Sequence, residues 1–123
     1  MKLPNGQDAR VDLTKVGEYL LADEHPTGSA KAAFFRSLGF VDSFAGLLCV
    51  ALTDIARNGR VTSIRASTFG TKYVVDGTIT GLRGVQARVR TVWIAEHGEA
   101  APRLVTAYPA GDTEQEGADD EGT

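Results

Sequence analysis

The sequence predicts an α+β domain in which N-terminal helices pack on one face of a C-terminal four-stranded antiparallel sheet. Apolar residues follow helical spacing in the first half, whereas the second half, from residue 61, is rich in β-branched side chains. The hydrophobic content of 42% is typical of a globular protein. A chain of 123 residues is long enough to form one core, since a domain of this size buries about two thirds of its unfolded surface.

Three helices are expected in the first half of the chain. The first follows Asp12, whose carboxylate is suited to an N-cap, and extends over residues 13–21. The second is expected over residues 30–38 and ends at Gly39, because glycine commonly follows the last helical residue. The third is expected over residues 44–56. Each carries an apolar stripe that can pack on a sheet.

Four strands are expected in the second half, at residues 61–67, 72–80, 85–95 and 103–108. Residues 81–84 contain two glycines and fit a hairpin loop, and residues 96–102 fit a longer loop. In the third strand, alternate positions are polar as far as Thr91, so one face is solvated and basic. The order of these segments predicts an antiparallel meander.

A single domain is expected over residues 1–110, followed by a disordered acidic tail over residues 111–123. The tail carries six acidic residues, no base and no large apolar residue. A solubilising tail is the simplest interpretation, and the alternative is a segment that competes with polyanions. Residues 57–103 carry eight bases and three acids, which permits a polyanionic partner, although basic strands with solvated faces are common.

Several classes of protein do not fit this sequence. No apolar stretch approaches the roughly 20 residues that span a bilayer, and the first residues lack the apolar core of a signal peptide. A cytoplasmic protein without a membrane partner is therefore expected. Cys49 and two histidines lack the spacing of metal ligands, so no metal site is predicted. Glycine motifs for nucleotides are also missing, and no cofactor is expected.

The turn that opens the second helix carries the first group of candidate site residues. His25 titrates near neutral pH and can exchange a proton. The backbone amides at the helix start, the Ser29 hydroxyl and the Lys31 cation together suit a negatively charged oxygen. Lys31 is unfavourable in the first helical turn by about 0.3–1 kcal/mol, which an anionic ligand offsets. The alternatives are a histidine in a surface turn and a lysine that extends into water.

The last strand carries the second group. Thr106 and Tyr108 are two positions apart and share a face, whereas Arg103 and Tyr108 are an odd number apart and are expected on opposite faces. Arg88 and Arg90 lie on the basic face of the third strand. The two groups form one active site only if the helix start and the last strand meet in space.

The sequence resembles an uncharacterised family of small bacterial domains. The resemblance extends over residues 2–109, and its motifs are residues 24–35, 38–40, 73–77, 92–94 and 103–109. These domains are similar to effector modules at the ends of bacterial polymorphic and contact-dependent toxins. That larger group, with barnase, EndoU, colicin tRNases and RelE, shares helices followed by a four-stranded antiparallel sheet.

The resemblance implies a metal-independent endoribonuclease that forms a 2′,3′-cyclic phosphate. In this role His25 is the general base or acid, and Lys31 neutralises the charge on the phosphorane. Thr106 and Tyr108 orient the phosphate or donate a proton. The residues expected to bind the substrate are Ser29, Arg88, Arg90 and Arg103.

Whether the chain is an enzyme stays open at this point. The catalytic residues of the group vary widely, and the sequence has no second histidine in an obvious position. The alternatives are a non-catalytic module that binds nucleic acid or protein, and an antitoxin or immunity-like partner. The expected partners are therefore RNA and a cognate inhibitor or antitoxin protein.

Overall fold

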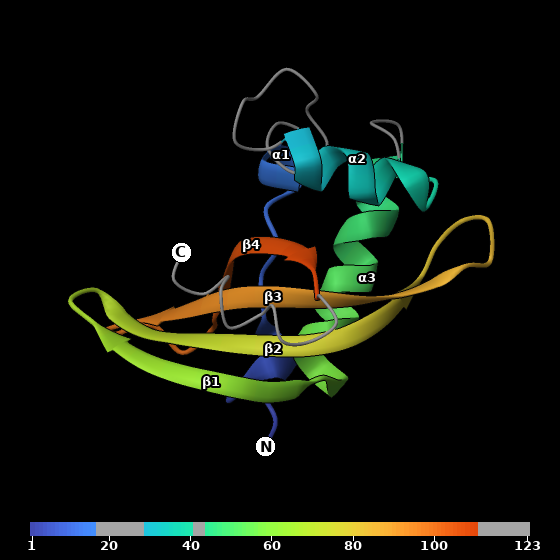
Figure 1. Cartoon of the computed structure of the whole chain (residues 1–123). Helices are drawn as coiled ribbons and strands as arrows, with labels where there is room; N and C mark the ends of the chain where they lie inside the picture. The colour runs from blue at the N-terminus through green and yellow to red at the C-terminus, as the bar shows by residue number, and fades with distance from the viewer. Residues whose placement is uncertain (17–28, 41–43, 111–123) are drawn as a thin grey trace.

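The computed structural model describes residues 1–16, 29–40 and 44–110. The elements in order are η1 (Gly6–Asp8), α1 (Leu13–Lys15), α2 (Ser29–Ser37), α3 (Ala45–Asn58), β1 (Arg60–Ser67), β2 (Gly70–Thr80), β3 (Gln86–Glu96) and β4 (Arg103–Pro109). The strands form one antiparallel sheet in the order β1-β2-β3-β4 (Figure 1). The predicted α+β arrangement is confirmed.

The helix ends agree with the sequence signals. The Thr14 N–H donates to the Asp12 carboxylate at 2.9 Å, which confirms Asp12 as the N-cap of α1. Gly39 follows α2 with φ +100°, a left-handed conformation that glycine adopts without a steric penalty. Helix α2 lies one residue earlier than predicted, and α3 extends two residues further, to Asn58.

The hairpins fix the register of the sheet. The loop at residues 81–84 is confirmed: the Gly81 N–H donates to the Val85 carbonyl at 2.8 Å, and Gly84 has φ +86°. Two register shifts interrupt the regular pairing. Each leaves one extra residue, Thr62 in β1 and Val105 in β4. Such a β-bulge changes which later residues of the strand share a face.

One face of the sheet is covered by α3 and the N-terminal segment (Figure 1). Helix α3 buries Leu48, Leu52 and Ile55 in the core that contains Trp93. It comes close to β2 because Gly77 has no side chain: a Cβ there meets Ile55 Cγ1 at 2.9 Å. Burial of each large apolar side chain contributes about 1.5–3 kcal/mol, so this face supplies most of the stability.

The N-terminal segment connects the two edges of the sheet. At one edge, the Met1 carbonyl accepts the Val61 N–H of β1 at 2.8 Å. At the other, Arg10 forms a parallel bridge with Arg103 of β4, and the Leu104 N–H donates to the Arg10 carbonyl at 3.0 Å. Between them Leu3 is buried in the core. This crossing was not predicted, because short segments without periodicity carry no pairing signal.

A buried hydroxyl links β2 and β3 beneath α3. The Thr91 hydroxyl donates to the Val75 carbonyl at 2.7 Å and accepts the Trp93 indole N–H at 2.6 Å. Thr91 and Trp93 are both fully buried. Every polar atom of this small network therefore has a partner, as burial requires.

The predicted disordered tail at residues 111–123 lies outside the described residues, as does most of the predicted first helix. No helix in the described part of the chain has the length and apolar character needed to cross a membrane.

Candidate functional site

The face of the sheet opposite α3 is here called the open face. No helix among the described residues covers it (Figure 1). Residues paired across antiparallel strands point to the same side, so the register defines the face: Arg60, Ser63, Arg65, Ser67, Gly70, Lys72, Val74, Asp76, Thr78, Thr80, Gln86, Arg88, Arg90, Val92, Ile94, Glu96, Arg103, Thr106 and Tyr108.

The open face is basic. Six of its residues are Lys or Arg and two are acidic, which gives a net charge of +4. The basic residues come from all four strands, so the charge is spread over the face. A surface of this kind attracts polyanions, because the potentials of neighbouring charges add.

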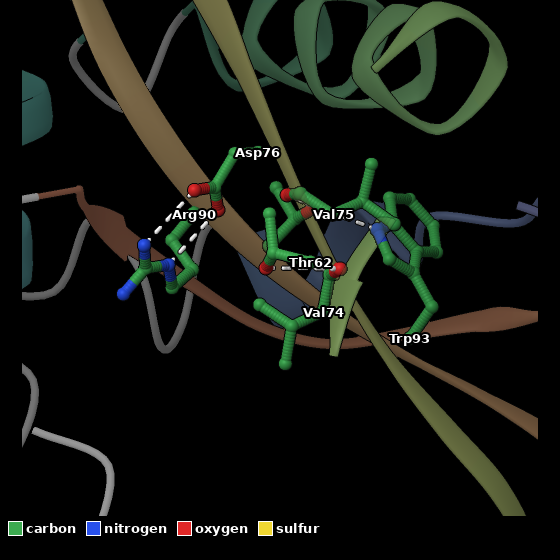
Figure 2. Close-up of polar contacts among 7 residues, drawn as sticks. Thr62, Val74, Val75, Asp76, Arg90 and Trp93 are labelled. Atoms are coloured by element: carbon green, nitrogen blue, oxygen red, sulfur yellow. Dashed lines mark hydrogen bonds and ion pairs between the residues drawn. The ribbon is translucent and has the colours of Figure 1, made fainter. Parts of the chain in front are cut away.

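Arg90 and Asp76 form an ion pair near the middle of the open face. The Arg90 Nε and Nη2 each donate to a carboxylate oxygen of Asp76 at 2.9 Å. The side chains are only 18% and 11% exposed, so the pair is screened less than a surface one. Figure 2 shows the pair on the opposite side of the strands from Trp93. Asp76 thus holds the Arg90 guanidinium in a fixed orientation.

Tyr108 and Thr106 lie on the open face beside this pair. Tyr108 is opposite Arg90, and Thr106 is opposite Val92. Both side chains are half-buried and both have interaction partners. Two candidate catalytic residues therefore share a face with two candidate binding residues, Arg88 and Arg90, as the alternation of the strands predicts.

The predicted position of Arg103 is wrong. The prediction placed Arg103 and Tyr108 on opposite faces, which holds for a regular strand. The extra residue Val105 shifts the pairing, so that Arg103 is opposite Ile94 while Tyr108 is opposite Arg90. Ile94 and Arg90 share a face, and Arg103 therefore joins Tyr108 on the open face. The sequence carries no clear signal for a bulge at this valine.

Arg103 and Arg88 differ in their surroundings. Arg103 forms an ion pair with Glu96 of β3, which belongs to the same face. Arg88 is exposed, and among the described residues no carboxylate pairs with it. Arg88 is therefore the better placed of the two to meet a polyanion.

Helix α2 lies next to β4, so the elements that carry the two groups of candidate residues are neighbours (Figure 1). The helix is anchored by Phe35, which is fully buried, and Leu38 directly after the helix is also buried. Ser29 and Lys31 belong to the first turn of α2. His25 lies outside the described residues, and its proximity to Thr106 and Tyr108 stays a prediction.

Three other features lie away from these candidates. A hollow between the N-terminal segment and the β3–β4 loop is lined by Asp8, Arg10, Gly98, Glu99, Ala100 and Ala101, and contains no predicted site residue. His97 is an exposed loop residue. Burial, and secondarily the nearby Asp12 carboxylate, raises the pKa of the Cys49 thiol, which disfavours the reactive thiolate. In the described part of the chain, no group of His, Cys, Asp and Glu has the arrangement of a metal site.

The chemistry available on the open face is that of phosphate binding. Guanidinium groups match phosphate oxygens in geometry, and the Thr and Tyr hydroxyls can each donate a hydrogen bond. An ion-paired Arg90 next to Tyr108 also orients this part of the face before a ligand arrives. This set of groups suits a phosphodiester better than a small neutral molecule.

A solved structure has a similar fold. It is described as "Contact-dependent growth inhibition toxin - immunity protein complex from Klebsiella pneumoniae 342", and one of its chains matches with a TM-score of 0.70 and 15% identity. The match covers 88% of this chain and 98% of that chain. At this identity the likeness establishes the fold alone. A comparison with curated proteins finds no match.

Sequence comparison identifies the family over almost the whole of the described fold. Residues 2–111 match the domain of unknown function DUF6883, and this match includes α2, α3 and all four strands. The chain belongs to this family.

Proposed function

We propose that the chain is a toxin-type endoribonuclease domain that cleaves RNA without a metal ion and forms a 2′,3′-cyclic phosphate. The main supporting observation is that Tyr108 and Thr106 lie on a basic sheet face beside Arg90. Their strand, β4, also contacts α2, the helix that carries Ser29 and Lys31. The fold shared with a chain of a contact-dependent growth inhibition complex adds support for a toxin-related role. The proposed place of action is the cytoplasm of a target cell.

In the proposed reaction, the 2′-hydroxyl of a ribose attacks the adjacent phosphorus and the 5′-oxygen of the next nucleotide leaves. His25 takes the 2′-proton or supplies a proton to the leaving oxygen. Lys31 neutralises the charge that develops on the phosphorane, since fixed charges act strongly where water is excluded. Tyr108 and Thr106 orient the phosphate or supply the second proton. One P–O bond forms, between the 2′-oxygen and phosphorus, and one P–O bond breaks, between phosphorus and the 5′-oxygen.

Substrate binding in this proposal uses the open face. Arg88 and Arg103 contact phosphates on either side of the cleaved bond, and Arg90 is held in place by Asp76. Backbone amides of the first turn of α2, near Ser29, add donors of the kind that bind anions. Such contacts weaken steeply as salt rises, because bound counterions are released from the RNA.

The test is cleavage of a structured RNA in EDTA by the purified chain. His25→Ala is expected to slow cleavage by about 10² to 10⁴, the usual contribution of a positioned acid or base. His97→Ala is the matched control, because His97 is the other histidine and lies in an exposed loop. The products should carry a 2′,3′-cyclic phosphate, detected by mass spectrometry. Intact RNA with the unaltered chain contradicts the enzymatic role.

The second candidate function is a binding module without catalysis, either for nucleic acid or for a protein such as a cognate toxin. The charge of the open face supports it independently of His25. This candidate predicts RNA or partner binding that survives His25→Ala and falls on charge reversal of Arg88 and Arg90. Growth inhibition on expression, relieved by a co-expressed inhibitor, favours the toxin. Binding to a cognate toxin without toxicity favours an immunity-type role.

A further inference from the structure

Four basic residues of the open face lack an acidic partner among the described residues. Asp76 pairs with Arg90, and Glu96 pairs with Arg103. The remaining basic residues are Arg60, Arg65, Lys72 and Arg88, and all four are exposed. Charges of one sign on one face repel each other and attract an oppositely charged segment. The open face therefore carries positive charge that the described residues do not neutralise.

The described part of the chain ends at Ala110, which is still paired with β3. The Ala110 N–H donates to the Arg88 carbonyl at 3.1 Å, in the same register that pairs β4 with β3. Ala110 therefore lies beside the exposed Arg88 on the neighbouring strand. The point at which residues 111–123 are attached is thus about one strand spacing from an exposed arginine.

The segment that begins there has the opposite charge. Residues 111–123 carry six acids and no base, against a net charge of +4 on the open face. We propose that residues 111–123 bind in cis to the open face as an internal polyanion that competes with external polyanions. Competition with RNA in particular rests on the function proposed above, whereas docking of the segment on the face does not.

The segment is long enough for this role. Thirteen residues span up to about 45 Å when extended. The four strands of the sheet, at a spacing of about 4.8 Å, make a face about 15 Å wide. Along the strands, Lys72 and Arg103 are opposite Ile94, six positions from Arg88, or about 20 Å. Every basic residue of the face is therefore within reach. A short tether also gives an effective concentration in the millimolar range, so weak charge contacts are sufficient for docking.

Docking is tested on the full-length chain with the charge of the segment removed. The variant replaces all six acids by amides: D112N, E114Q, E116Q, D119N, D120N and E121Q. Backbone NMR shifts of Arg65, Arg88 and Tyr108 are expected to differ between this variant and the unaltered chain at low salt. The differences should disappear at about 1 M salt, where the Debye length is about 3 Å. Identical low-salt spectra on the open face overturn the proposal.

Two controls test whether the charge of the segment is sufficient, whatever the order of its residues and whether or not it is attached to the chain. A full-length variant with the same thirteen residues in another order is expected to keep the low-salt shifts, because the attraction is electrostatic. A synthetic peptide of residues 111–123, added to the amide variant, should restore the shifts at the same positions. Failure of the peptide at millimolar concentration contradicts docking.

Competition is measured with a single-stranded RNA oligonucleotide in EDTA, in a His25→Ala background in which cleavage is expected to be slow. The amide variant is expected to bind about tenfold tighter than the unaltered segment at low salt, if the trans affinity is near 100 μM and the effective concentration near 1 mM. Equal RNA affinity despite altered shifts overturns the competition. If neither form binds RNA, the proposed function fails while the NMR result still decides docking.

Discussion

The two faces of the sheet are built from the same strands but serve different purposes. The covered face carries Thr91 and Trp93 of β3, both fully buried beneath α3. The open face carries Arg88 and Arg90, which alternate with them along the same strand. The covered face accounts for stability through apolar burial and satisfied hydrogen bonds. The open face carries the charge and is expected to contribute less to stability, so changes on the two faces should affect different properties.

The largest expected effect is on the covered face. Trp93→Ala removes a fully buried indole and is expected to destabilise the fold by about 3–5 kcal/mol. It also leaves the Thr91 hydroxyl without its donor. Urea unfolding followed by circular dichroism measures the loss. A destabilisation below about 1 kcal/mol contradicts the packing described for this face.

A smaller effect is expected where α3 meets β2. Gly77→Ala places a methyl group against the Ile55 side chain, whose nearest atoms lie at 2.9 and 3.0 Å, and should cost about 1–3 kcal/mol through overpacking. Gly46→Ala is the matched control, because no atom lies within 4 Å of its added Cβ. Because Gly46 lies in helix α3, Gly46→Ala should raise the free energy of unfolding by about 0.5–1 kcal/mol. Equal effects of the two substitutions in thermal unfolding count against the close contact.

The ion pair on the open face should contribute less than the core. Asp76→Asn keeps the shape of the side chain but removes the charge that Arg90 binds through two hydrogen bonds. A loss of about 1–2 kcal/mol is expected, since the pair is only partly exposed. A double-mutant cycle with Arg90→Gln isolates the pair energy. A coupling energy near zero indicates that the pair does not hold Arg90 in place.

The smallest effect on stability is expected for Arg88. Arg88→Gln should change the free energy of unfolding by no more than about 0.5 kcal/mol, because the side chain is exposed. A plot of the logarithm of RNA affinity against the logarithm of salt concentration has a negative slope. The same substitution should reduce the magnitude of that slope by about one. Arg83→Gln, an exposed arginine in the loop between β2 and β3, should leave that slope unchanged. Equal slopes for both variants contradict binding on the open face.

Sequence pattern predicted the class of fold, because helical and strand periodicities change sharply near residue 60. Local signals also placed the Asp12 cap, the Gly39 helix end and the 81–84 loop. These features depend on neighbouring residues, whose preferences can be read directly. The predicted bounds of the four strands agree with the observed bounds within two residues at each end.

The candidate site was less accessible to prediction, since it depends on how distant strands are aligned. The alternation of side chains along one strand predicted that Thr106 and Tyr108 share a face. The bulge at Val105 and the Asp76–Arg90 pair depend instead on how neighbouring strands are paired. Register is determined by side-chain packing across strands as well as by loop length. The N-terminal bridge at Arg10 belongs to the same class of long-range pairing.

The bulge in β4 affects how relatives of this chain should be aligned. With Val105 as the extra residue, an arginine and a tyrosine that share a face are five positions apart. In a relative whose strand is regular, the equivalent pair must be an even number of positions apart. Removal of the one extra residue gives a separation of four. A one-residue gap between these positions therefore marks a change of pairing in the strand while both side chains keep their places on the sheet.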